Sequence, residues 1–429
     1  MDAGTLNSHT LVLSTAPHNF AGAGAAHART LELLASSGAT VQFWVPEIPF
    51  RMDELERAGV QVAISRITSD AYGTSDTVIY GAVAEAMLRA ATQWLQNHPD
   101  NRVILFATYL FPFCTTVEMV ARILWRFEGR VECVLNPAGS DIWQIGRQIP
   151  EVARQLIDSR HVTAVVTYAP RFASEIRTMI GSERNIVIIP PAIDVVKFAP
   201  PESSQRAVMR GSMGISEHEF VISHCSNHRP VKGLSHVFEI AGRFSAVLDE
   251  DVHLLMIGPI TAHLCDALAL AGLPAPSDRL PYVGRLGKLH ITCTGLQGDV
   301  RHFHAIGDVA LNTSLHDSFN ISLGEAMACE SPVLTTDVAG IASLIEEYEC
   351  GASFPFEFNP LYAEHEIALT GKSRIQIDAA VAWLVHIRRD EKLRKEFGKR
   401  ARKAIIDRCS DAVVAKKWCQ LFSLGVGPE

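Results

Sequence analysis

Residues 309–345 read VALNTSLHDSFNISLGEAMACESPVLTTDVAGIASLI, and this stretch predicts the fold. Two short runs in it, Val309–Asn312 and Val333–Thr336, are rich in the apolar and β-branched residues that strands prefer. Between them, Ile321–Cys329 contains the alanine, leucine and methionine typical of a helix. A helix that connects two consecutive strands predicts that the strands are parallel, with a right-handed crossover. The stretch therefore indicates an α/β sheet.

The same alternation of strand and helix extends along most of the chain. Further candidate strands are Leu11–Ser14, Val41–Trp44, Val60–Ile64, Val103–Phe106, Val131–Leu135, Ala164–Thr167, Ile186–Ile189, Val221–His224 and Val252–Ile257. Candidate helices between them are Ala26–Ser36, Ala82–Gln96, Thr115–Trp125, Val152–Ser159, Arg171–Ile180 and Leu234–Val247, and a helical pattern is predicted throughout residues 375–424. This order predicts doubly wound sheets with helices on both faces.

The chain is long enough for two domains. It has 429 residues, which exceeds what one ordinary core holds. The alternation stops at the paired prolines of Ile189–Ala192 and Phe198–Pro201, which suit a stiff link. We predict Rossmann-like domains at 1–197 and 198–429, with ligands at the carboxyl ends of the strands in the cleft between the domains. The last helix is expected to cross back to the first domain.

The composition is that of a cytoplasmic protein. Hydrophobic residues make up 48% and charged residues 20% of the sequence, and the net charge of −8 argues against nucleic acid as a partner. Nine cysteines without a C-x-x-C pair are typical of reduced thiols. The N-terminus lacks the basic region of a signal peptide, and no apolar run approaches the length of a membrane span. We therefore expect cytoplasmic localisation and no strong membrane signal.

Two acidic residues stand at the centre of the quoted stretch. Asp317 is in the loop after the strand Val309–Asn312, and Glu325 is on the following helix. The backbone of Ser318, Phe319, Asn320 and Ile321 would open that helix, and a helix N-terminus favours diphosphates and sugar hydroxyls. A carboxylate one turn into the helix can accept hydrogen bonds from a ribose diol. The alternative is an exposed aspartate and a helix-capping glutamate.

A pair of cations follows the strand Val221–His224. Arg229 and Lys232 lie three residues apart, at the point where the next helix opens. Two positive charges at such a turn can neutralise a departing pyrophosphate. The alternative is a solvated surface pair.

Two candidate sites lie in the first half of the chain. The loop at residues 19–27 contains Gly22 and Gly24, and it is similar to the loop by which a glycosyltransferase family lets backbone approach the donor phosphates. It superficially matches the dinucleotide fingerprint, but it begins too far after the first strand, and His27 fills the last position. In the run PAGSD at residues 137–141, Asp141 is either an acceptor contact or a turn cap.

These motifs resemble those of the retaining family-4 glycosyltransferases, which have the GT-B fold and belong to the glycosyl transferases group 1. The resemblance rests on the two acids eight residues apart, the EAMAC core at 325–329, the downstream PVLTTDVAGI run and the R-x-x-K-G motif at 229–233. It implies that Asp317 contacts the donor sugar, Glu325 the ribose, and Arg229 and Lys232 the diphosphate.

The sequence departs from the family pattern at three places. Asp317 stands where the family usually has glutamate, and Ala138 replaces a histidine that lies near the donor sugar or acceptor. Pro191 and Ala192 replace an asparagine and a glycine in the link. The role of the missing histidine cannot be carried over, and the shorter arm of Asp317 indicates either a different donor sugar or a weakened site.

The resemblance implies transfer of a sugar from a nucleoside diphosphate sugar to an acceptor, with retention of anomeric configuration. We expect no cofactor and no metal, because cations and helix dipoles take the metal's place. The acceptor is expected to be a small soluble molecule or a glycan. Asp249–Asp251 spells D-x-D but fits a solvated turn, and His224, Cys225 and His228 fit core and loop positions better than a metal site.

Three alternatives stay open. One is a non-catalytic protein of the same fold that binds nucleotide sugars or acts as a scaffold, which the departures at Asp317, Ala138 and Pro191 would favour. Another is an NAD-dependent oxidoreductase that uses Gly22, Gly24 and Glu47. The third is an epimerase, which would isomerise a sugar or release free diphosphate without an acceptor.

Overall fold

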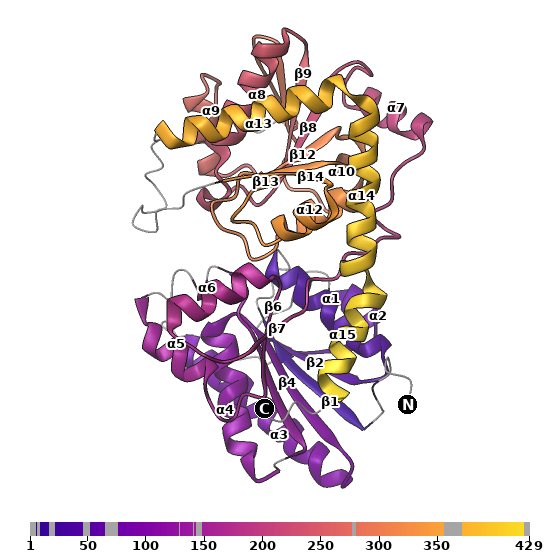
Figure 1. Ribbon diagram of the computed structural model, residues 1–429. Helices are drawn as coiled ribbons and strands as arrows, with labels where there is room; N and C mark the ends of the chain where they lie inside the picture. The colour runs from indigo at the N-terminus through magenta and orange to yellow at the C-terminus, as the bar shows by residue number, and fades with distance from the viewer. Residues whose placement is uncertain are drawn as a thin grey trace. The chain divides into compact units, whose positions relative to one another are not determined.

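The computed structural model divides the chain into two compact units. The first comprises Met1–Ala192 together with Asp411–Glu429, and the second comprises Ile193–Ser410 (Figure 1). The structure describes residues 6, 9–16, 22–45, 52–64, 76–127, 129–139, 141–142, 148–276, 280–355 and 371–423. The division falls five residues before the predicted boundary at 197, directly after the paired prolines. The C-terminal segment joins the first unit.

The first unit contains a seven-stranded parallel sheet with the order β3-β2-β1-β4-β5-β6-β7. The strands are β1 (Thr10–Thr15), β2 (Thr40–Val45), β3 (Val60–Ile64), β4 (Arg102–Thr108), β5 (Val131–Asn136), β6 (Ala164–Thr167) and β7 (Ile186–Ile188). All seven were predicted, because each is a short apolar run between helical segments.

Helices cover both faces of this sheet. They are α1 (Ala23–Ser36), α2 (Met52–Arg57), α3 (Asp76–Asn97), α4 (Thr115–Ile123), α5 (Pro150–Ile157), α6 (Pro170–Ile180) and α15 (Asp411–Ser423). Along β1, Leu11 and Leu13 enter one apolar cluster and Val12 enters the other. This alternation follows from the period of two in a strand and gives the unit a core on each side.

Helix α15 packs into the first unit through an aromatic core. Trp418 and Phe422 are fully buried, and the ring centroid of Trp418 lies 5.0 Å from that of Phe106 on β4. Arg102 donates to the carbonyl of Phe422 at 3.0 Å, and Arg29 on α1 pairs with Asp411. The last helix of the chain thus belongs to the core of the first domain.

The second unit contains a seven-stranded sheet with the order β10-β11-β9-β8-β12-β13-β14. The strands are β8 (Phe220–Cys225), β9 (Val252–Ile257), β10 (Tyr282–Leu286), β11 (Leu289–Cys293), β12 (Val309–Leu311), β13 (Val333–Thr336) and β14 (Gly351–Phe354). Only the pair β10–β11 is antiparallel among the pairings of the described strands. The sequence analysis did not predict β10, β11 or β14.

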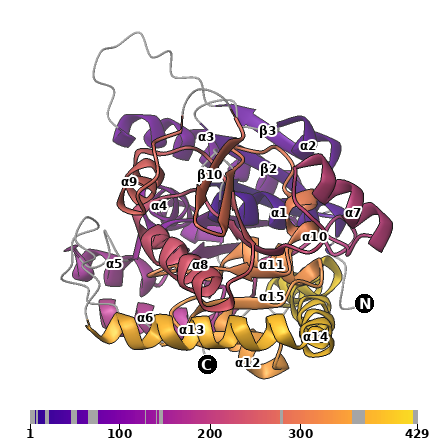
Figure 2. The ribbon, with the colours of Figure 1, turned by 90° about the horizontal axis from the view of Figure 1, so that it is seen from above.

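The helices of the second unit again lie on both faces of the sheet. They are α7 (Ser203–Ser212), α8 (Leu234–Leu248), α9 (Ala262–Leu270), α10 (Arg301–Ile306), α11 (Ile321–Ala328), α12 (Ala342–Tyr348), α13 (Gly371–Arg389) and α14 (Glu391–Cys409). Helix α13 packs against α8, as Figure 2 shows. In the described part of the chain, no helix is both long and apolar enough to cross a membrane.

Candidate active site

The candidate site lies at the carboxyl ends of β8 and β12, which are neighbours in the second sheet. The loop after β8 ends in a short 3₁₀ turn, Pro230–Lys232, followed by Gly233 in the left-handed conformation (φ 61°). The loop after β12 runs beside it. Thr313 Oγ1 lies 2.9 Å from the carbonyl oxygens of both Lys232 and Gly233, and Leu315 N donates to Val231 O at 2.8 Å. The two loops therefore form one hydrogen-bonded layer.

This layer brings together two of the predicted residues. Lys232 Nζ donates to Asp317 Oδ2 at 2.7 Å, and the two side chains are only 17% and 13% exposed. Asp317 Oδ1 accepts from Phe319 N at 3.3 Å, and its backbone carbonyl accepts from Gly340 N at 2.9 Å. A cation and a carboxylate are thus held at the end of the sheet, where open α/β folds bind ligands.

Helix α11 begins with a residue in a special conformation. Asn320 has φ 81° and ψ 80°, and its Oδ1 accepts from Leu323 N at 3.1 Å. Asparagine suits this position because it tolerates the left-handed region and caps the helix with its own side chain. Ser318, Phe319 and Asn320 are buried, and Ile321 is partly buried. Since the Phe319 N–H is bonded to Asp317, its predicted role towards a donor would require exchange of that bond.

Glu325 lies one turn into α11 and faces a buried histidine on α10. The distance from Glu325 Oε2 to His304 Nε2 is 3.5 Å, and Glu325 is 20% exposed while His304 is 2% exposed. Burial alone would lower the pKa of His304, but interactions with Cys225 and Glu325 raise it to about 9. The imidazole therefore carries a positive charge near pH 7, at 3.5 Å from the carboxylate of Glu325.

Arg229 is placed differently from Lys232. Its side chain is exposed, its carbonyl accepts from Lys232 N at 2.9 Å, and it forms no ion pair with an acidic residue of the described chain. Lys232 is paired with Asp317, whereas Arg229 keeps its charge on the surface beside them. An incoming anion would meet both cations.

The glycine loop lies in the first unit, at the carboxyl end of β1. Gly22 is exposed, has φ 55° and precedes α1, and a Cβ atom there would touch nothing within 4 Å. Gly24 is buried in the first turn of α1. Residues 17–21 of the loop lie outside the described residues. Of the two glycines, Gly22 is the one whose backbone is accessible.

Comparison with known proteins agrees with this geometry. Residues 205–404, nearly all of the second unit, match the family model of the glycosyl transferases group 1. One relative, the N-acetyl-alpha-D-glucosaminyl L-malate synthase of Bacillus anthracis, is 23% identical over 392 residues, which cover 91% of this chain and 90% of that protein. The second unit is similar to the glycosyl transferases group 1, and this similarity supports a glycosyltransferase.

Similarity to solved structures identifies the fold class of the glycosyltransferase. A glycosyltransferase of Rickettsia africae superposes with a TM-score of 0.70 at 15% identity, covering 99% of this chain and 100% of that chain. The Anabaena protein HepE, solved in complex with UDP-glucose, gives a TM-score of 0.68 at 14% identity, with 97% and 99% covered. The glycosyltransferase therefore has the two-domain GT-B fold, as predicted.

The structure gives Asp141 of the glycosyltransferase a partner within the protein. Its side chain is buried, and Oδ2 accepts from Leu110 N at 2.8 Å, which ties the residue to the turn after β4. Burial raises the pKa of Asp141 to about 6, against the opposing effect of backbone hydrogen bonds. This geometry favours the turn-fixing alternative. Ala138, which replaces the family's histidine, is likewise buried.

Several histidines of the glycosyltransferase have structural partners. His27 bonds to Ser14 Oγ at 2.6 Å and to Thr108 Oγ1 at 2.7 Å, and burial lowers its pKa to about 3. His224 Nδ1 lies 3.0 Å from Leu311 O, and His228 Nδ1 lies 2.7 Å from Pro259 O. These contacts agree with core and loop roles for both.

His304 is the site residue that the sequence analysis missed. It comes from α10, which precedes β12 in the chain, so no local motif connects it to Glu325. The two helices meet beside a small cavity of about 10 Å³, about the size of one water molecule. Its lining residues are Ser223, Cys225, His304, Ala310, Leu311, Asn312, Ser322 and Leu323.

Proposed function

We propose that this glycosyltransferase moves a sugar from a nucleoside diphosphate sugar to a small soluble acceptor, in the cytoplasm and with retention of anomeric configuration. The observation that carries the proposal is the ion pair of Lys232 and Asp317 beside the N-terminus of α11. It combines a cation for a phosphate with a carboxylate for sugar hydroxyls, which are the two recognition groups that such a donor requires.

The charges suit departure of a diphosphate. As the bond between the anomeric carbon and the diphosphate oxygen breaks, negative charge grows on the diphosphate. Lys232 and Arg229 would stabilise that charge, and the N-terminus of α11 would add its positive dipole end. The acceptor oxygen forms the new bond to the anomeric carbon on the same face, and its proton passes to a phosphate oxygen. Catalysis in this scheme requires no metal and no other cofactor.

The two acids would select the donor. Asp317 Oδ2 is held by Lys232, and its Oδ1 accepts from Phe319 N, so the carboxylate is oriented before a sugar arrives. Glu325 is held by charged His304 and would accept hydrogen bonds from the ribose. We infer that His304 positions Glu325 and contacts no substrate itself, because it is 2% exposed.

The relatives support a small acceptor. Two of the names among them are N-acetyl-alpha-D-glucosaminyl L-malate synthase and D-inositol 3-phosphate glycosyltransferase. The second is represented by a protein of Geodermatophilus obscurus that is 24% identical over 46% of this chain and 44% of that protein. The acceptors in both names are small, water-soluble molecules.

The donor is tested by the thermal stability of the purified protein with UDP, GDP, ADP, dTDP, their sugars and NAD. We expect one nucleotide and its sugars to raise the melting temperature of the wild type but not of Lys232→Ala. Lys288→Ala is the matched control, since Lys288 pairs with Asp249 in the turn before β9. Stabilisation by NAD alone would overturn the proposal, and so would the absence of any shift with nucleotide sugars. The anomeric configuration of the product, read by NMR, tests retention.

A further inference from the structure

Three side chains with metal-binding atoms meet at the amino ends of three neighbouring strands. Glu219 directly precedes β8, His253 is the second residue of β9, and His290 is the second residue of β11. His290 pairs with His253 in the register of the sheet, and Val221 pairs with His253 from the other side. Glu219 lies two residues before Val221, so all three side chains project from the same face.

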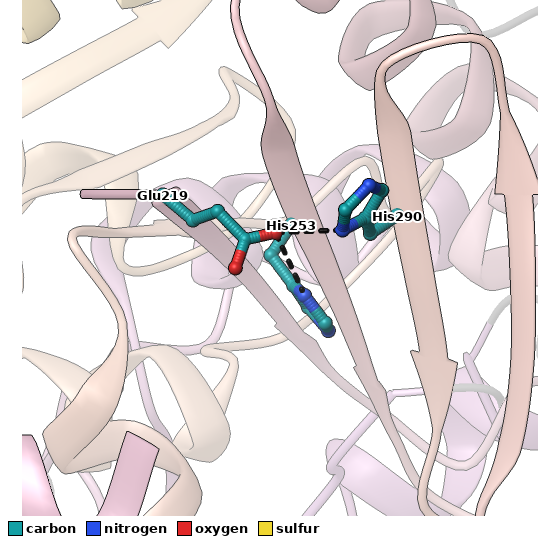
Figure 3. Close-up of side chains that lie close together, drawn as sticks. All are labelled: Glu219, His253 and His290. Atoms are coloured by element: carbon teal, nitrogen blue, oxygen red, sulfur yellow. Dashed lines mark ion pairs between the residues drawn. The ribbon is translucent and has the colours of Figure 1, made fainter. Parts of the chain in front are cut away.

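The side chains point at a common centre. Figure 3 shows both rings directing a nitrogen at the same carboxylate oxygen of Glu219. Glu219 Oε1 lies 2.7 Å from His290 Nδ1 and 3.7 Å from His253 Nδ1, and the three ligand atoms are all within 4.8 Å of one another. Ligand atoms of a tetrahedral zinc ion are about 3.3 Å apart. Small side-chain movements would bring the three atoms to that spacing.

One of these atoms lacks a hydrogen-bond partner. Glu219 and His253 are 7% and 4% exposed, and His253 Nδ1 has no hydrogen bond with the described residues. Glu219 Oε1 is 3.7 Å away from it, too far to bond, and has its close contact with His290 Nδ1 at 2.7 Å. A buried polar atom without a partner is costly, and a cation between His253 and Glu219 would satisfy it.

The second nitrogen or oxygen of each of these side chains faces a polar neighbour. His253 Nε2 lies 2.9 Å from Thr292 Oγ1, which leaves Nδ1 free to ligate when Nε2 carries the proton. Glu219 Oε2 accepts from Ser216 N at 2.6 Å, while His290 Nε2 lies 3.6 Å from Asp251 Oδ1, beyond hydrogen-bond distance. Metal-binding histidines usually have such partners on the second nitrogen.

The charges around the cluster allow a divalent ion. Arg210 lies close enough to act on His253, but its guanidinium is paired with Asp308 at 2.7 Å. One carboxylate and two imidazoles are donors that zinc accepts and that magnesium and calcium disfavour.

We propose that Glu219, His253 and His290 bind one zinc ion that ties β8, β9 and β11 together. The site lies at the opposite end of β8 from the candidate active site, separated from it by about 20 Å of strand. The zinc ion therefore contributes to the stability of the second unit and takes no part in sugar transfer. The alternative is a cluster held only by the contact of His290 with Glu219.

The experiment measures zinc bound to the full chain, purified without a histidine tag and treated with EDTA. Zinc is added in competition with a chromogenic chelator, and the bound metal is counted after gel filtration. We expect one zinc ion per chain in the wild type and none in His290→Ala or Glu219→Gln. Thr292→Val should weaken zinc binding by about ten- to a hundredfold, because it removes the support of His253.

The controls separate this site from other zinc-binding groups. His302→Ala removes an exposed histidine on α10 outside the cluster and should leave zinc binding unchanged. The nine free cysteines are present in every variant, so zinc held by thiols would persist in His290→Ala and Glu219→Gln. Circular dichroism checks that each variant is folded. A wild type without zinc, or retention of zinc by either folded variant, would overturn the proposal.

Discussion

Asp317 and Lys232 hold each other at the end of the second sheet. Aspartate has a shorter arm than the glutamate usual in the family, yet its carboxylate still reaches Lys232 Nζ at 2.7 Å. The pair leaves Asp317 Oδ1 bonded to a backbone N–H, so the carboxylate has little rotational freedom. At the scale of the residue, the departure from the family pattern shortens the acidic side chain but keeps both charges.

Removing the lysine tests its role in the reaction. We expect Lys232→Ala to lower kcat by about a hundred- to a thousandfold, because a charge that stabilises the leaving group is lost. The measurement is steady-state turnover with the donor found by thermal shift, and Lys288→Ala should stay near the wild-type rate. Turnover of Lys232→Ala within a few-fold of the wild type would contradict the assignment.

The raised pKa of His304 predicts that the stability of the protein depends on pH. Its pKa is raised to about 9 from an ordinary value of 6.5, so its charged form stabilises the folded state. This contribution is fully present below pH 6.5 and is lost as the pH rises through 9. We expect it to amount to about 3 kcal/mol of the free energy of unfolding. Denaturant unfolding at pH 6 and pH 9.5 should show a loss in the wild type that is absent from His304→Gln. Equal losses in both proteins would show that another group is responsible.

At the scale of the element, the turn between β8 and α8 holds the candidate site in place. Gly233 has φ 61°, and a Cβ atom at this position would lie 2.4 Å from the carbonyl oxygen of Thr313. Only glycine allows this approach of the two loops. The R-x-x-K-G motif therefore contains a conformational requirement as well as two charges.

Replacing this glycine tests the requirement. We expect Gly233→Ala to lower the free energy of unfolding by about 2–4 kcal/mol and to weaken donor binding, because the loops must separate. The control is Gly242→Ala, where a Cβ atom would meet nothing within 4 Å. That change lies inside α8 and should stabilise the protein by about 0.5–1 kcal/mol. Denaturant midpoints measure the stability, and nucleotide titrations measure donor binding. A Gly233→Ala variant with unchanged stability would contradict the close approach of the two loops.

At the scale of the whole molecule, the chain ends in the unit where it began. Helix α14 belongs to the second unit and α15 to the first, with the change of unit at Ser410 and Asp411. Trp418 on α15 completes the core of the first unit, while Trp383 on α13 packs in the second. The stability of the first unit therefore depends on α15 as well as on residues 1–192.

A pair of tryptophan substitutions tests this assignment. We expect Trp418→Ala to cost about 3–5 kcal/mol and to reduce hydrogen-exchange protection in β1 and β4, while β8 and β9 stay protected. Trp383→Ala should affect the second unit and spare the first. Loss of protection in β8 and β9 on replacing Trp418 would show that α15 supports both units.

The sequence alone predicted the alternating strands and helices, because periodicity and turn residues are local properties of the chain. It missed β10, β11 and β14. The hairpin β10–β11 is antiparallel, with Gly287 in its turn, and interrupts the βα alternation on which the prediction rested. These strands depend on long-range pairing, as β11 does on β9, which local patterns do not encode.

The residue types of the candidate site were also readable from local motifs, since Arg229, Lys232, Asp317 and Glu325 stand in two short segments. Only the tertiary structure decided which of these residues meet. It paired Lys232 with Asp317, placed His304 against Glu325, buried Asp141 in a turn, and gathered Glu219, His253 and His290 from three strands. Contacts of this kind come from sheet order and register, which depend on the packing of the whole unit and on no single stretch of sequence.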